Sequence, residues 1–279
     1  MDLSIISVTW NSEKFIKKQI ESVKLFCDSI EYEQIVIDNN STDNTVELLK
    51  QSSVQLVVNA TNRGFAAANN QGAKTAKGDY LLFLNPDMEL TADTKMKEMI
   101  DFMKANTNCG IMSCKLVDGT GKTNRYEGVR RFPKIWQMLA LILKIPHVFP
   151  FILNSYHYRD VDLSTIQEVD SVRGSFMLVK KEIIVKLGRA FDERYFIWLE
   201  DVDLCREVVK MGYKIVYNPV FTCIDLVGRS FSKVNNLKKQ IYFMNSLLIY
   251  FQKWEPRYKW IWIKIFKPVG IFLVWLFKG

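Results

Sequence analysis

Residues 35–45 read IVIDNNSTDNT, and at Asp38 they change from β-branched residues to polar ones. The apolar run predicts a short buried strand that ends where the polar residues begin. The polar run from Asp38 to Asp43 predicts a turn whose side chains cap a following helix. This stretch therefore predicts a strand, a polar turn and a helix in direct succession.

The same succession extends outward from this stretch on both sides. Strands are predicted at residues 3–9 (LSIISVT), 55–58 and 80–84 (YLLFL), and helices at 15–26, around 46–49 and at 66–76. Alternating strands and helices predict an α/β fold with a parallel sheet covered on both faces. Polar residues directly follow these strands, and ligands of open α/β sheets bind at that edge.

The second half of the chain has a less regular pattern. It predicts strands at 109–117 and 169–180, helices at 181–187 and 200–211, and a loop at 118–134. Residues 135–154 are strongly apolar but are interrupted by Pro146 and Pro150. The interruptions make this stretch a poor candidate for a membrane span.

The composition is that of a globular protein. The chain has 279 residues, of which 48% are hydrophobic and 24% are charged. These values exclude a disordered chain, a collagen-like fibre and a protein with many membrane spans. The five cysteines form no CxxC pair, and the first residues lack a secretion signal, so we expect a reducing, cytoplasmic compartment.

The positive charge is concentrated at the C-terminal end. Residues 229–279 contain ten Lys and Arg but one acidic residue, and they hold four of the seven tryptophans. Basic and aromatic residues mixed with large aliphatic ones favour contact with an anionic membrane surface over nucleic-acid binding. Within residues 259–278 the longest uncharged run, from Pro268 to Phe277, is half of the roughly 20 residues that a span requires. We expect an amphipathic helix at the membrane interface; the alternative is a core helix that ends in a lysine tail.

Two carboxylates follow predicted strands. Asp87 ends the turn Asn85-Pro86-Asp87, where a carboxylate would bind Mg²⁺ or Mn²⁺; the alternative is an ordinary turn. Asp38 would accept a hydrogen bond from a base or a ribose; the alternative, which is compatible with it, is helix capping.

Three acidic residues begin the helix predicted at 200–211. Glu200, Asp201 and Asp203 are close enough for one to have a raised pKa and act as a general base. The alternative is stabilisation of a helix N-terminus by negative charge. Neither a GxGxxG, a GxxxxGK[ST] nor a GxSxG pattern occurs, which argues against a dehydrogenase, an ATPase and a serine hydrolase.

Taken in order, five segments resemble family 2 glycosyltransferases with the GT-A fold, a Rossmann-like, mostly parallel sheet flanked by helices. They are SVTWN (7–11), IVIDNNSTDNT (35–45), NRGFAAANN (62–70), LNPDMEL (84–90) and FDERYFIWLEDVDLCRE (191–207). NRGF and NPD are similar to the rhamnosyltransferase-like subgroup. The resemblance implies a GT-A domain at 1–231, with a nucleotide-sugar half at 1–108 and an acceptor half at 109–231. Residues 232–279 are then a membrane-associating helical extension.

The resemblance also implies a role for each matching residue. Asp201 would be the catalytic base, supported by Glu200 and Asp203. The residues that would contact the nucleotide are Thr9, Asn11, Asp38, Asn40, Asn62, Arg63, Asn69 and Asn85. Asp87 and Asp225 would bind the metal, and Arg229 and Ser230 would contact the diphosphate. Asp225 stands where the family often has a metal-binding His, so the ligand set departs from the family pattern.

The implied activity is that of an inverting, Mg²⁺- or Mn²⁺-dependent glycosyltransferase of cell-surface polysaccharide synthesis. The first candidate donor is dTDP-rhamnose, and the expected acceptor is a saccharide carried on a polyprenyl diphosphate at the inner face of the cell membrane. The alternatives are a transferase that uses UDP-hexose or UDP-N-acetylhexosamine, and a non-catalytic scaffold that binds nucleotide sugar or membrane. A nucleotidyltransferase is less favoured.

Overall fold

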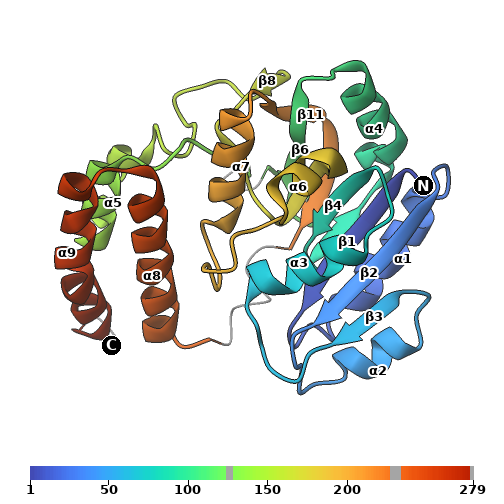
Figure 1. The fold of residues 1–279 in the computed structure, drawn as a ribbon, viewed down its shortest axis with the longest axis horizontal. Coiled ribbons are helices and arrows are strands. Elements are labelled where there is room, and N and C mark those ends of the chain that lie inside the picture. Colours follow the sequence, from blue (N-terminus) through green and yellow to red (C-terminus); the bar gives the residue numbers. More distant parts are fainter. Residues whose placement is uncertain (124–127, 227–233, 277–279) are drawn as a thin grey trace.

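A mixed sheet forms the centre of the computed structural model, which describes residues 1–123, 128–226 and 234–276 (Figure 1). Within these residues nine strands form the sheet, in the order β3-β2-β1-β4-β10-β6-β11-β5, with β8 paired to β11. Their bounds are β1 Leu3–Thr9, β2 Tyr32–Asp38, β3 Gln55–Val58, β4 Tyr80–Leu84, β5 Met88–Leu90, β6 Cys109–Val117, β8 Gln167–Glu168, β10 Phe176–Lys180 and β11 Lys214–Asp225. A separate ribbon pairs β7 (Val129–Arg130) with β9 (Ser171–Val172).

The N-terminal half confirms the predicted alternation. Strands β3, β2, β1 and β4 are parallel, and the helices that join them are α1 (Ile16–Phe26), α2 (Thr45–Lys50) and α3 (Phe65–Thr75). Every residue of β4 is buried, as expected of a strand covered on both faces. The carboxyl ends of these parallel strands meet at one edge, and the polar turns after β1, β2 and β4 are gathered there.

The second half departs from the prediction in several places, among them the short strand β7 inside the loop predicted at 118–134. The strand predicted at 169–180 is wrong: Arg173–Ser175 separate β9 from β10. The twelve-residue strand β11 has no counterpart in the sequence prediction. Its pairing with β6 shifts register between Asn218 and Thr222, around Pro219, which lacks the N–H that a regular ladder needs.

Three helices pack together beside the sheet and form what we call the helical unit. They are α5 (Ile135–Ile142), α8 (Asn236–Trp254) and α9 (Arg257–Leu276), at the left of Figure 1. The remaining helices are α4 (Met96–Ala105), α6 (Lys181–Leu187) and α7 (Glu200–Lys210), with short 3-10 turns η1 (Ala92–Thr94), η2 (Ile145–His147) and η3 (Pro150–Leu153). The apolar stretch 135–154 thus packs on the C-terminal helices, although it lies in the predicted acceptor half.

A buried carboxylate joins the helical unit to α7. Asp203 has no exposed surface; its Oδ2 accepts a hydrogen bond from Lys253 Nζ at 2.6 Å, and its Oδ1 accepts one from Trp254 Nε1 at 2.6 Å. Lys253 also contacts Glu207 at 2.8 Å. The structure therefore places Asp203 at the junction of α7 and α8, where both of its carboxylate oxygens bind side chains of α8.

Replacing Asp203 by Ala should destabilise the protein by about 2 kcal/mol, because it removes a fully buried carboxylate that accepts hydrogen bonds from the half-buried Lys253 ammonium and Trp254 indole N–H. Urea denaturation measures this loss. Lys210→Ala, at the exposed end of the same helix, is the control and should change stability by less than about 0.5 kcal/mol. Equal effects of the two substitutions would contradict the anchoring role.

Candidate active site

Asp201 lies in the first turn of α7 and is held by two backbone N–H groups. Its Oδ2 accepts a hydrogen bond from Gly174 at 3.0 Å, and its Oδ1 accepts one from Val202 at 2.8 Å. The residue is 7% exposed. A Cβ at position 174 would lie 3.4 Å from the Asp201 Cβ, so glycine allows the backbone to approach this carboxylate closely. The carboxylate is thus oriented by the chain rather than free to rotate.

The turn that precedes α7 has a strained backbone. Trp198 and Leu199 have φ values of 69° and 68°, in the left-handed region that bulky residues avoid. Ser246 Oγ of α8 donates a hydrogen bond to the Ile197 carbonyl at 2.8 Å, and this contact helps to hold the turn. Strain of this kind is found mainly where a site needs a fixed geometry.

Glu200 is buried beside Asp201. Burial, followed by the charge of Asp201, raises its pKa well above the ordinary value. Its Oε2 accepts no hydrogen bond from any described residue. Both effects disfavour the charged form of Glu200 relative to a carboxyl in water.

Arg130 is a positively charged group of this site that the sequence analysis did not identify. Burial lowers its pKa, but the Tyr156 hydroxyl and the carboxyls of Asp201 and Glu200 raise it more, so the net shift is upward. The strand β7 places it there, inside a stretch that the sequence predicts only as a loop. Arg130 therefore contributes a positive charge that interacts electrostatically with Asp201 and Glu200.

The tripeptide Arg173-Gly174-Ser175 is a second omission. Phe176 pairs with Leu84 in the antiparallel β10–β4 ladder, so the residues before one strand lie beside the residues after the other. The Asn85 N–H donates to the Ser175 carbonyl at 2.9 Å. Ser175 Oγ is buried and forms no hydrogen bond within the described residues. The sequence signal that could have found this tripeptide is its polarity: it interrupts the apolar residues of the predicted strand directly before Phe176.

The structure brings Asp87 and Asp225 together. Asp225 is the register partner of Met88, and the Leu226 N–H donates to the Asp87 carbonyl at 3.1 Å. Both aspartates are nearly fully buried. Arg173 Nη1 lies 2.9 Å from Asp225 Oδ2, so this carboxylate already has a cationic partner.

Oxygen ligands of this kind fit a hard divalent ion, which commonly uses one or two carboxylates and completes its shell with water and substrate phosphate. Within the part of the chain that the structure describes, no group of three or more His, Cys, Asp or Glu side chains is arranged to hold a metal ion. The predicted diphosphate residues, Arg229 and Ser230, lie outside the described residues.

The ends of β1 and β2 meet as predicted. Thr9 Oγ1 donates to Asp38 Oδ1 at 2.9 Å, and the Ser41 N–H donates to Asp38 Oδ2 at 2.8 Å. Asp38 is fully buried, so it organises the turn in addition to any contact with a base. Asn11 and Asn40 both have positive φ; Asn11 Oδ1 accepts from the Thr42 N–H at 2.8 Å, and Asn40 is exposed.

The residues from 62 to 70 divide into two groups. Asn62 Oδ1 accepts from the Gly64 N–H at 2.9 Å, and the Arg63 side chain is exposed, so both stay at the edge of the sheet. Asn69 is buried in α3 and donates to the Phe65 carbonyl at 3.0 Å, which is an internal helix contact. Asn70, which the sequence analysis did not single out, accepts from the Phe191 N–H at 2.8 Å and joins α3 to the segment between α6 and α7.

We expect Glu200→Gln to stabilise the protein increasingly as the pH rises. A carboxyl whose pKa is raised by folding contributes stability below its unfolded pKa and loses that contribution as the pH passes its folded pKa. Glutamine has no charge to bury, so the difference between variant and wild type should grow by at least about 1 kcal/mol between pH 5 and pH 8.5.

Urea denaturation at the two pH values measures the difference, with the exposed Glu21→Gln as the matched control. A difference that does not change with pH would contradict the raised pKa.

Comparison with known proteins identifies the family of the chain. The sequence model described as glycosyl transferase family 2 matches residues 4–184. Rhamnosyltransferase WbbL of Escherichia coli (strain K12) is 27% identical over 227 residues, which are 79% of this chain and 81% of that protein. The N-acetylglucosaminyl-diphospho-decaprenol L-rhamnosyltransferase of Mycobacterium tuberculosis (strain H37Rv) is 25% identical over 232 residues, 78% of this chain and 73% of that protein.

Two solved structures share the fold. The mannosyltransferase PcManGT from Pyrobaculum calidifontis, in complex with GDP-Man and Mn²⁺, has a TM-score of 0.60 at 20% identity and covers 96% of this chain and 71% of its own. TarS 1-349 of S. aureus, in complex with UDP, has a TM-score of 0.53 at 18% identity and covers 89% and 66%. These likenesses confirm the expected GT-A fold. Because the family model spans more than half of the chain, this protein belongs to glycosyl transferase family 2 and is a transferase.

Proposed function

We propose that this protein is an inverting, metal-dependent rhamnosyltransferase that moves a sugar from dTDP-rhamnose to a saccharide carried on a polyprenyl diphosphate, in the synthesis of a cell-surface polysaccharide. The observation that carries the proposal is Asp201, buried and oriented by Gly174 beside the turn that bears Asp87. Two relatives named rhamnosyltransferases support the sugar, and the decaprenol in one of their names supports the acceptor class. UDP-hexose and UDP-N-acetylhexosamine remain the competing donors.

Asp201 acts as the general base of this mechanism. Its carboxylate takes the proton of an acceptor hydroxyl while the hydroxyl oxygen bonds to the anomeric carbon of the donor sugar. The bond from that carbon to the diphosphate breaks on the opposite face, so the configuration is inverted and a nucleoside diphosphate leaves. The backbone contacts of Asp201 hold one oxygen on Gly174, which fixes the direction of the base.

Asp87 and Asp225 would hold the divalent ion. When bound, Mg²⁺ or Mn²⁺ neutralises charge on the departing diphosphate. Arg173 lies against Asp225 and supplies a second positive charge at the same edge of the sheet. Arginine suits phosphate oxygens, so Arg173 would share the binding of the diphosphate with the ion.

Donor turnover tests the proposal. Purified protein with Mn²⁺ is mixed with dTDP-rhamnose, UDP-glucose or UDP-N-acetylglucosamine and an N-acetylglucosaminyl-diphospho-prenol, and release of nucleoside diphosphate is measured. We expect release from dTDP-rhamnose that EDTA abolishes. Asp201→Asn should lower kcat by at least about 100-fold, because it removes the base.

Asp28→Asn, the same change at an exposed position, is the control and should leave kcat unaltered. Release from a UDP-sugar alone would replace the proposed donor. Nucleotide binding without release from any donor would favour the scaffold, and full activity in EDTA would contradict metal dependence.

Association with the inner face of the cell membrane is the second part of the proposal. One face of α9 exposes apolar side chains at intervals of three or four residues, which places them in one stripe. The stripe consists of Tyr258 (70% exposed), Trp262 (49%), Ile265 (51%), Val269 (39%), Phe272 (53%) and Leu276 (54%). No helix within the described residues is long and apolar enough to cross a membrane. A stripe of this kind, with lysines in the same helix, suits a helix that lies in the membrane interface.

Replacing both Trp262 and Phe272 by Ser should reduce binding to vesicles that contain an anionic phospholipid by at least about tenfold, since each removes a large apolar side chain from the interface. Vesicle co-sedimentation measures the binding. The control replaces Leu25 and Val185, which are exposed on α1 and α6, by Ser. Unchanged sedimentation of the α9 variant would contradict membrane association through this stripe.

A further inference from the structure

A cavity within the described residues lies beside the helical unit, and none of the residues predicted to contact the nucleotide lines it. It has a volume of about 1400 Å³, is partly open to solvent, and is lined by the segment from α5 to His157, by α8, by α9 and by the turn that precedes α7. Apolar side chains form most of its wall, from Leu143 and Leu153 on one side to Phe243 and Leu273 on the other. Typical pockets for small ligands measure about 300–1000 Å³, so this one suits a longer ligand.

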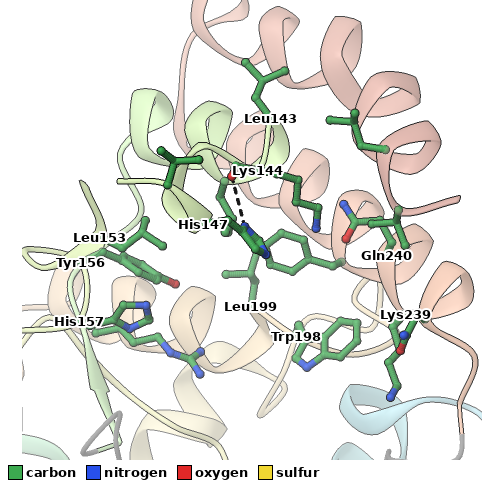
Figure 2. Close-up of a pocket in the computed structure, with 17 residues that line it drawn as sticks. Leu143, Lys144, His147, Leu153, Tyr156, His157, Trp198, Leu199, Lys239 and Gln240 are labelled. Carbon is green, nitrogen blue, oxygen red and sulfur yellow. Dashed lines mark hydrogen bonds between the residues drawn. The ribbon is translucent and has the colours of Figure 1, made fainter. Parts of the chain in front are cut away.

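The cavity has a positive lining. Arg130, Lys144 and Lys239 line it together with His147 and His157, and no Asp or Glu does. Figure 2 shows Lys144 and His147 on one side and Lys239 and Gln240 of α8 on the other.

Lys144 forms no ion pair with any described residue, and burial lowers the pKa of its amine. An anion bound beside Lys144 would offset this cost of desolvation. The cavity therefore combines an apolar wall with the positive charge of Lys144, Arg130 and Lys239.

One end of the cavity reaches the catalytic turn. Trp198 and Leu199 belong to its wall, and Glu200 follows Leu199 directly in the chain. Arg130 lines the cavity and interacts electrostatically with Asp201. A charged group held here would place the next group of the same ligand near the base.

We propose that this cavity binds the diphosphate and the first isoprene units of a polyprenyl-diphosphate-linked acceptor, and this inference rests on the proposed function. The diphosphate lies among Arg130, Lys144 and Lys239, which are suited to phosphate oxygens. The chain runs along the apolar wall, which includes Leu273 of α9. The sugar that the diphosphate carries then lies toward Asp201. Because α9 also bears the exposed apolar stripe, the lipid would pass from the membrane to the site along one helix.

Binding of farnesyl diphosphate, measured by quenching of tryptophan fluorescence, tests the inference without catalysis. We expect saturable binding, with farnesol and inorganic diphosphate each at least about tenfold weaker. Lys144→Gln and Lys239→Gln should each weaken binding about tenfold, since each removes one charge-assisted contact. Lys238→Gln, the same change at the next and exposed position of α8, is the matched control and should bind as the wild type does.

A negative charge added at the rim of the cavity tests the inference by a second route, which leaves the lysines in place. Val148 lines the cavity and is 73% exposed, so Val148→Asp should fold and should repel the diphosphate, whereas Val185→Asp on α6 should not affect binding. Equal binding by all variants would overturn the inference. Equal binding of inorganic diphosphate would overturn the part that concerns the lipid.

Titration with dTDP separates this inference from the proposed function. We expect dTDP to bind all these variants equally and not to compete with farnesyl diphosphate. Intact dTDP binding without any binding of farnesyl diphosphate would refute the acceptor cavity and leave the transferase in place. Competition between the two ligands would assign the cavity to the nucleotide and would also refute it.

Discussion

The antiparallel pairing of β10 with β4 is the contact on which the rest of the site depends. It joins a parallel sheet built from residues 3–84 to strands from the second half of the chain. Since Phe176 pairs with Leu84, the backbone just before β10 lies beside the turn just after β4. That backbone holds Asp201 through Gly174 and approaches Asp225 through Arg173. This pairing brings Asp201 and Arg173 to the turn after β4, and the β11–β5 pairing brings Asp225 beside Asp87 at the same edge.

The helical unit is part of the site rather than an appendage. It is attached where α7 begins and along its length: Ser246 contacts the strained turn before Glu200, and Lys253 and Trp254 bind Asp203. A strained turn persists only when its surroundings hold it, and here α8 supplies part of that support. A helix that contacts a membrane would therefore be joined through one packed cluster to the turn that carries the base.

The electrostatics of the site follow from burial. Glu200 and Asp201 are adjacent, buried acids, and burial together with the charge of Asp201 raises the pKa of Glu200. Arg130 supplies positive charge between these acids and the cavity. The Arg130 guanidinium can therefore stabilise the negative charge of these acids and attract an anionic acceptor. A single buried cation would then serve both, which matters because burying each further charge costs free energy.

The sequence by itself determined the α/β class, the strands and helices of the first 84 residues and the family, because periodicity and turn chemistry act within short windows. The resemblance also predicted roles for Asp201, Asp87 and Asp225; the structure brings Asp87 and Asp225 together, and the roles themselves stay predictions. The sequence did not reveal the contacts of Asp203. In the sequence this residue is one of three neighbouring acids, and only the structure shows its hydrogen bond with Lys253, fifty residues later in the chain. Arg130, Arg173 and the cavity were likewise decided by the tertiary structure alone. Contacts between strands and helices far apart in the chain leave no pattern in a single sequence. The sequence of each segment reflects its own periodicity and turns, whereas the pairing of two distant segments depends on how the whole chain packs.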